Sequence, residues 1–397
     1  MRKKSSWMRW ALSGLIMTPV TALAVSDGGL SAGSGLSQLQ TSVGTSPAGE
    51  SKNKLEVTAG LSARSLEDEI INSKYAGGTL GIVGSRKISE QLSGRLDLGF
   101  EFMSGSYTNQ FDEAMAQDGQ APNVFYVNEA ALTYTPWAPV SLEAGVIKTE
   151  FSSLPSTFEQ MGFPALRESV QLSNENHQGR FFAMQAIPTS ATGAVKPAEG
   201  GLITQVSLLG VSYSNDPQEE KDTVLNAGLT GFEFRNLNAS AATDSQYLGN
   251  SVVSPGSQAR FLYDFAGYET AVSVKQKFGD QALGLSGSFL RNERAPEGYN
   301  KAYLYALDYE NKFAGRDVKL SGGYFYNEPD TLPASYASAG KGSNNRFGQL
   351  ARVTIEDKKE NIAGKIEYMK ANEIIDRPYT ADREVIQFSL EAKYEIL

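Results

Sequence analysis

Within the stretch from Val385 to Leu397, apolar and polar side chains alternate from Ile386 to Ile396. The apolar side carries Ile386, Phe388, Leu390, Ala392, Tyr394 and Ile396, and the other side carries Gln387, Ser389, Glu391, Lys393 and Glu395. A side-chain period of two is the signature of a β-strand with two chemically different faces. In an outer-membrane β-barrel such a strand turns its apolar face to lipid and its polar face to a wet lumen.

The first 24 residues have the pattern of a secretory signal peptide. Four basic residues precede a short apolar run from Trp10 to Val20, and Ala22-Leu23-Ala24 offers a cleavage site. No later stretch offers ~18 consecutive apolar residues, so transmembrane helices are not expected. We therefore expect an exported chain with three parts: a signal peptide at 1–24, a Gly/Ser-rich N-terminal segment at 25–53, and a β-barrel at 54–397.

Charge and cysteine content exclude several classes of function. Removing the four basic residues of the leader from the 36 in the chain leaves 32 against 45 acidic residues, a net charge of −13. This balance argues against nucleic acid as a partner. The chain has no cysteine, which excludes a disulfide framework and thiolate metal sites.

Strand patterns recur from Lys54 onward, and the connections between them alternate in length. Short turns are expected near 86–90, 136–140, 279–282, 314–317 and 357–361, and long connections near 104–122, 150–178, 292–301, 328–345 and 372–383. Short periplasmic turns and long extracellular loops are typical of outer-membrane barrels. The count is 16 strands, with 14 possible because the pattern between 232 and 267 is irregular.

Aromatic residues near the strand ends suggest interfacial girdles. Those expected near the short turns are Tyr134, Trp137, Phe278, Phe313 and Tyr394, and those near the long loops are Phe102, Tyr126, Tyr303, Tyr324 and Tyr326. Ordinary β-propensity also favours tyrosine and phenylalanine and is the simpler alternative.

The connection 150–178 is the third long loop in this count and carries unusual apolar surface for a loop. We expect it to fold into the lumen and to narrow the pore, with Glu159, Arg167 and Glu168 facing the channel. An extracellular lid or an interface with neighbouring protomers remains an alternative. The loop 328–345, rich in Ser, Ala, Gly and Asn, reads instead as an exposed tip.

Alternation also predicts which charged side chains line the wall of the lumen. Charged side chains at the narrow part of a pore set its selectivity. The predicted lining residues are Arg95, Asp97, Glu101, Glu129, Glu143, Lys275, Lys277, Arg352, Lys365 and Glu367. The mixture of signs suggests a transverse field across the lumen.

Three short stretches resemble the porin superfamily and, more loosely, the phosphate-selective (O/P-type) porins. They are Asn128-Glu129-Ala130, Leu142 to Lys148, and Phe163 to Ser169, about 45 residues in all from the first to the last. The resemblance implies a strand pair followed by a loop that enters the pore. The anion site of that family relies on clustered basic residues. The loop of this chain instead offers Arg167 beside the acidic Glu159 and Glu168.

Catalytic motifs are not evident. The single histidine, His177, excludes histidine-pair zinc motifs and is expected to be a polar loop residue. The glycine-rich stretch 77–84 matches neither a phosphate-binding loop nor a dinucleotide fingerprint. We expect no enzymatic activity, no cofactor and no metal.

Together these observations predict an all-β transmembrane antiparallel barrel in the outer membrane of a Gram-negative bacterium. Its expected function is passive diffusion of small hydrophilic solutes and ions through a water-filled lumen. The expected partners are outer-membrane lipid, lipopolysaccharide and further copies of the chain in a homotrimer. Two alternatives remain open: a non-conducting barrel whose surface loops act in adhesion or partner binding, and a soluble all-β secreted protein.

Overall fold

The computed structural model describes residues 53–68, 72–106, 124–148, 162–174, 176–188, 203–216, 221–254, 258–336, 344–377 and 380–396. The expected signal peptide 1–24 and the segment 25–53, apart from Asn53, lie outside these residues. Among the residues described, no helix is long or apolar enough to cross a membrane.

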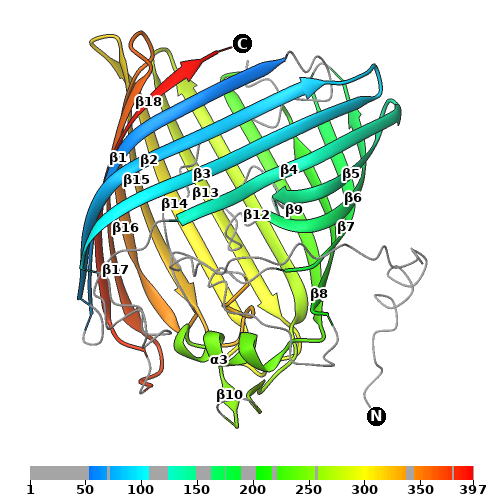
Figure 1. Ribbon diagram of the computed structural model, residues 1–397, viewed down its shortest axis with the longest axis vertical. Coiled ribbons are helices and arrows are strands. Elements are labelled where there is room, and N and C mark those ends of the chain that lie inside the picture. Colours follow the sequence, from blue (N-terminus) through cyan, green and yellow to red (C-terminus); the bar gives the residue numbers. More distant parts are fainter. Residues whose placement is uncertain are drawn as a thin grey trace.

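Sixteen antiparallel strands close into one barrel (Figure 1). In chain order they are β1 Lys54–Asp68, β2 Asn72–Lys87, β3 Leu92–Ser106, β4 Val124–Trp137, β5 Val140–Lys148, β6 Gly162–Ser173, β7 Gln178–Ala186, β8 Gln205–Ser214, β9 Thr223–Arg235, β12 Ala266–Phe278, β13 Gln281–Asn292, β14 Lys301–Phe313, β15 Arg316–Asn327, β16 Arg346–Asp357, β17 Ile362–Glu373 and β18 Arg383–Glu395. The connection from β9 to β12 also contains α3 Ala239–Tyr247 and a small hairpin of β10 Val252–Val253 and β11 Arg260–Phe261. The predicted count of 16 is confirmed.

Closure is made between β1 and β18, which pair from Glu56 opposite Glu395 to Asp68 opposite Arg383. The strand expected at 385–397 is therefore β18, hydrogen-bonded on both sides. The five predicted short turns are confirmed as the connections after β2, β4, β12, β14 and β16. Two more short connections, after β6 and β8, were not predicted.

The outer face of the barrel is apolar along the middle of the strands. Large exposed apolar side chains there include Leu61, Leu96, Leu132, Leu229, Leu285, Leu307, Ile366 and Leu390. A soluble sandwich would bury such faces between two sheets, whereas a single closed barrel leaves them outside. This apolar outer surface suits a hydrocarbon surrounding.

Aromatic rings form a continuous band on the outer face of β12 to β15. Centroids of Tyr268 and Phe289 are 6.0 Å apart, those of Phe289 and Tyr303 are 5.2 Å apart, and those of Tyr303 and Tyr326 are 6.0 Å apart. Tyr126 does not belong to the outer band. Its ring lies over Gly99 on the inner face of the wall, at the place where a side chain on Gly99 would stand.

The prediction of one long loop over 150–178 is wrong in its extent. Residues 162–173 form β6, and a short turn, in which the Asn174 amide donates to the His177 carbonyl oxygen, leads into β7. Residues 149–161 lie outside the described part of the chain.

The other irregular region, 232–267, contains the end of β9, the start of β12 and the long connection between them, which lies at the end of the barrel away from the C-terminal end of β18 (Figure 1). Residues 236–254 and 258–265 of this connection, together with residues 328–336 after β15, are called the cap below. The expectation that 328–345 is an exposed tip is wrong for its described part, because Leu332 and Tyr336 are 0% and 1% exposed.

Candidate functional site: the charged inner wall

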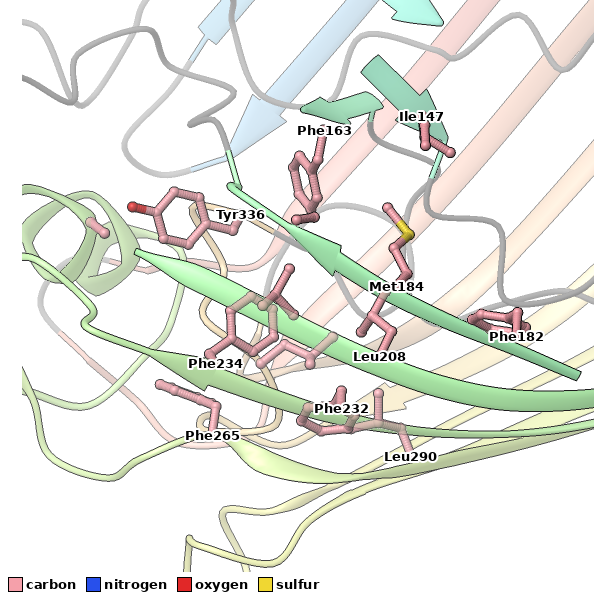
Figure 2. Close-up of a cluster of buried hydrophobic side chains, with 14 of the residues drawn as sticks. Ile147, Phe163, Phe182, Met184, Leu208, Phe232, Phe234, Phe265, Leu290 and Tyr336 are labelled. Carbon is pink, nitrogen blue, oxygen red and sulfur yellow. The ribbon is translucent and has the colours of Figure 1, made fainter. Parts of the chain in front are cut away.

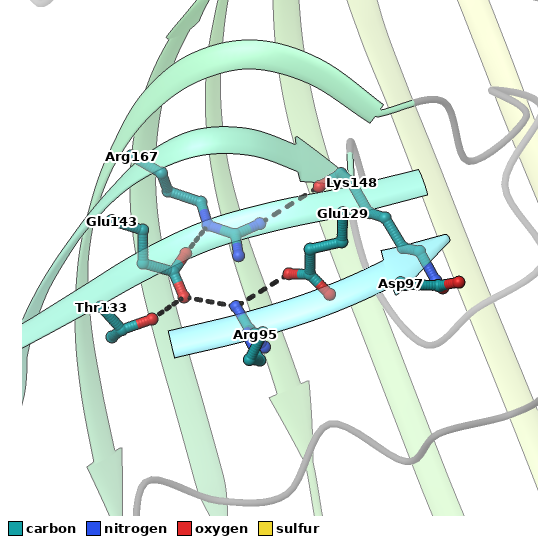
Figure 3. A network of polar contacts seen from close by, with 7 residues as sticks. All are labelled: Arg95, Asp97, Glu129, Thr133, Glu143, Lys148 and Arg167. Atoms are coloured by element: carbon teal, nitrogen blue, oxygen red, sulfur yellow. Dashed lines mark hydrogen bonds and ion pairs between the residues drawn. The ribbon is translucent and has the colours of Figure 1, made fainter. Parts of the chain in front are cut away.

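Strand alternation places charged side chains on the inner face of β3 to β6, opposite the exposed leucines. Arg95 and Asp97 on β3, Glu129 on β4 and Glu143 on β5 come together there (Figure 3). Arg167 joins them from β6, where it lies in register with Glu143. Five of the predicted lumen-facing residues therefore form one network.

Glu143 is the centre of this network. Its carboxylate accepts from the Arg167 Nε, from the Arg95 Nη2 at 2.8 Å and from the Thr133 hydroxyl at 3.3 Å. Arg95 Nη2 also lies 3.1 Å from the Glu129 carboxylate. Since Arg167 and Glu143 are both buried, this ion pair is part of the wall itself, whereas Arg95 is partly exposed.

A second ion pair extends the network toward the long loops. Lys148 Nζ lies 2.5 Å from Asp97 Oδ2, and the Asn128 amide donates to the other oxygen of Asp97 at 3.2 Å. Lys148 was not predicted as a site residue, because alternation assigns it to the face of Leu142. It follows Gly145, whose positive φ of 133° interrupts the regular course of β5.

The three residues predicted to line the constriction lie in three different places relative to that prediction. Arg167 lies in the wall of β6, not in a loop. Glu168 follows Arg167 and is on the face of Leu166 and Val170, which are exposed on the outside, so its assignment to the constriction is wrong. Glu159 lies outside the described residues.

Two further groups of charges lie elsewhere on the inner face. Arg352 on β16 binds Glu367 on β17 through Nε at 2.7 Å and Nη2 at 2.5 Å. Lys275 on β12 lies 2.8 Å from Glu310 on β14, and Lys319 on β15 lies 3.4 Å from the same carboxylate and 3.6 Å from Asp308. Gly284 of the intervening strand β13 lies in register with Lys275 on one side and with Asp308 on the other.

The remaining predicted wall residues share the inner face with these groups. Glu101 follows Asp97 along β3 and is buried, Lys277 follows Lys275 along β12, and Lys365 precedes Glu367 on β17. Glu310, Asp308 and Lys319 were not predicted as site residues, although alternation along 301–313 places the first two on the polar side.

His177 lies in the short turn after β6. Its Nδ1 is 2.8 Å from the Tyr213 hydroxyl, and the two rings stack with centroids 5.9 Å apart. Among the described residues, no group of three or more histidine or acidic side chains has an arrangement that could hold a metal ion.

The fold and its inner face define a class: a closed 16-stranded antiparallel barrel, apolar outside and lined by paired charges inside. No protein-family profile matches the sequence, and no curated protein matches it. Among solved structures, the chain is similar to OmpF of Salmonella typhi in complex with daunomycin, with 12% identity, a TM-score of 0.49, and 85% of this chain and 98% of the other covered.

The chain is also similar to two other solved structures. For OccAB3 of Acinetobacter baumannii the identity is 7% and the TM-score 0.49, with 87% of this chain and 100% of the other covered. For OpdK of Pseudomonas aeruginosa the identity is 10% and the TM-score 0.45, with 86% of this chain and 98% of the other covered.

Proposed function

We propose that the protein is a porin of the Gram-negative outer membrane, through which small hydrophilic solutes and ions diffuse passively. The observation that carries this proposal is a closed barrel of 16 strands with an apolar outer face and charged groups on its inner face. Barrels of this size are wide enough to leave an aqueous channel. The proposal includes export by the leader 1–24 and assembly as a homotrimer in lipid and lipopolysaccharide. It includes no enzymatic step.

Arg95, the partly exposed cation of the inner-wall network, is more exposed than its two carboxylate partners. Arg95 is 37% exposed, whereas its partners Glu129 and Glu143 are 14% and 7% exposed. Lysine and arginine reach outward on long stems, while the shorter carboxylates stay close to the backbone. We infer that the group of this network nearest to a passing solute is the positive Arg95, although the chain as a whole is acidic, and that anions pass more easily than cations.

The test is conductance in a planar lipid bilayer, with protein purified in detergent and shown to be folded by its heat-modifiable migration in gels. Discrete open steps are the expected result. A salt gradient across the same bilayer then gives a reversal potential, whose sign reports the preferred ion.

The alternative is a non-conducting barrel that binds partners through its surface loops. Correctly folded and inserted protein without conductance would exclude the porin and favour this alternative. Conductance with a cation preference would keep the porin and exclude the proposed role of the exposed cations.

A further inference from the structure

The segment 328–336 is polar in sequence and yet completely enclosed. Among its members Asp330, Thr331 and Leu332 are 0% exposed. A loop in contact with water would expose such side chains, and a buried loop must satisfy its backbone groups in some other way. The segment is therefore built into the protein and does not project from it.

Its apolar side chains reach across the end of the barrel. Leu332 and Tyr336 belong to one buried cluster with Phe163 of β6, Met184 of β7 and Phe234 of β9 (Figure 2). The segment follows β15, which is separated from β6 by seven steps around the 16-stranded barrel. A segment that leaves β15, shares one buried cluster with inner-face residues of β6, β7 and β9, and accepts at the Tyr336 hydroxyl from the Asn238 amide at 3.4 Å lies over the mouth of the lumen.

Asparagine side chains fix this crossing segment in place. Asn250 donates to the carbonyl oxygens of Pro329 and Leu332 at 3.0 and 2.9 Å, and Asn344 donates to the same two oxygens at 2.8 and 2.7 Å. The side-chain oxygen Oδ1 of Asn250 also accepts from the backbone N–H of Ala334 at 2.9 Å. Both asparagines are almost fully buried, so these bonds replace the strand ladder that the segment lacks.

A third asparagine ties the segment to the barrel wall. Asn292, at the end of β13, donates to the Asp330 carbonyl oxygen at 2.8 Å and to the Asp264 carbonyl oxygen at 3.0 Å. It thus joins both parts of the cap to a strand. Three separate regions of the chain hold the same short segment through side-chain amides.

We infer that the cap is a fixed partition across the long-loop mouth of the pore that sets the largest solute able to pass, and that Asn250 and Asn344 are its positioning residues. This inference rests on the proposed function. Substituting one asparagine removes one of the two side-chain donors to each of these buried carbonyl oxygens, and the double substitution removes both, so that the oxygens must then find water. The cap then loosens and the mouth widens, while the charged wall further along the barrel is unchanged.

The experiment compares wild-type protein with Asn250→Ala, Asn344→Ala and the double variant. Each is reconstituted in liposomes, and swelling is followed with neutral sugars from monosaccharides to tetrasaccharides, which report size without charge. The matched control is Asn226→Ala, an asparagine of β9 that donates to Ser273 at 3.3 Å and lies outside the cap. If the double variant fails to fold, Leu332→Ala, which trims the cap without removing a hydrogen bond, takes its place.

The expected result is a higher size limit for the cap variants, with entry of tri- and tetrasaccharides rising at least threefold relative to monosaccharide. The Asn226→Ala control should keep the wild-type ratio. A wild-type protein that admits monosaccharides, with variants that lose thermal stability but keep the same size limit, would overturn the inference and leave the porin standing. A wild-type protein that admits no solute would overturn the proposed function itself.

Discussion

Replacing Glu143 with glutamine tests whether the inner-wall network is structural. The substitution leaves Arg167, whose side chain is 8% exposed, without a carboxylate at its Nε and with little water to replace it. A hydrogen bond to a charged group contributes about 1.5–3 kcal/mol, and breaking a buried pair costs about 3–5 kcal/mol. Arg95 is partly exposed and keeps its ion pair with Glu129, so losing its contact with the carboxylate of residue 143 should cost only about 0–1 kcal/mol. We expect a loss of about 3 kcal/mol in the free energy of unfolding.

The measurement is equilibrium unfolding in guanidinium from lipid vesicles, followed by the fluorescence of Trp137, which is 64% exposed on the outer face. The matched control is Glu310→Gln. Glu310 pairs with Lys275 and Lys319, and all three side chains are partly exposed, so its loss should cost about 0–1 kcal/mol. An equal loss in the two variants would refute the argument that burial makes the Glu143 network different.

Three further predictions follow from single residues. Arg95→Gln should move the reversal potential in a salt gradient toward cation preference, and no movement would show that Arg95 does not govern the field in the lumen. Glu168→Leu should leave stability unchanged or raise it by about 1 kcal/mol, because a carboxylate on a lipid-facing surface is unfavourable; the same unfolding assay would contradict this by showing a clear loss. Burial raises the pKa of the Asp330 carboxyl above its usual value, so the cap should be most resistant to proteolysis below that usual value and lose resistance as pH rises through the raised pKa. Asp330→Asn should abolish this dependence, and a variant with the wild-type pH profile would assign the effect to another group.

The barrel itself could be predicted because alternation is a local property. Each strand has one face in an apolar surrounding and one in a polar surrounding. Side-chain polarity therefore has a period of two in segments such as 91–103 and 385–397. Short turns between such segments fix the order of strands. These two facts led to the count of 16 strands, with 14 left possible by the irregular pattern between 232 and 267.

The strand β6 was missed because its pattern is weak at its start. Phe163 is packed under the cap and Leu166 faces outward, so both faces of the strand are apolar there, and Pro164 suggests a loop. Phe163 belongs to one buried cluster with Tyr336, which is far away in sequence. Local alternation fails where a distant segment turns an inner face into a core.

The cap could not be predicted for a related reason. Asn250 and Asn344 are polar and belong by composition to exposed loops, and nothing near them in sequence indicates their shared partners at Pro329 and Leu332. Ion pairs within the wall were only partly predictable. Alternation gives the face of Arg95 and Glu143, whereas the reach of Lys148 to Asp97 depends on the irregular course of β5.

The pairing of β1 with β18 governs how this protein can be made. Until β18 is in place, β1 has an open edge along the whole register from Glu56 to Asp68, and no earlier strand can satisfy it. Unpaired backbone groups are not tolerated in hydrocarbon, so a barrel of fifteen strands is no stable intermediate inside a bilayer. Insertion and closure must therefore be coupled, and the chain has to be kept unfolded and unaggregated in water for the time it takes to emerge. A defect in β18 would consequently cause loss of the protein before assembly, and not a pore of smaller diameter.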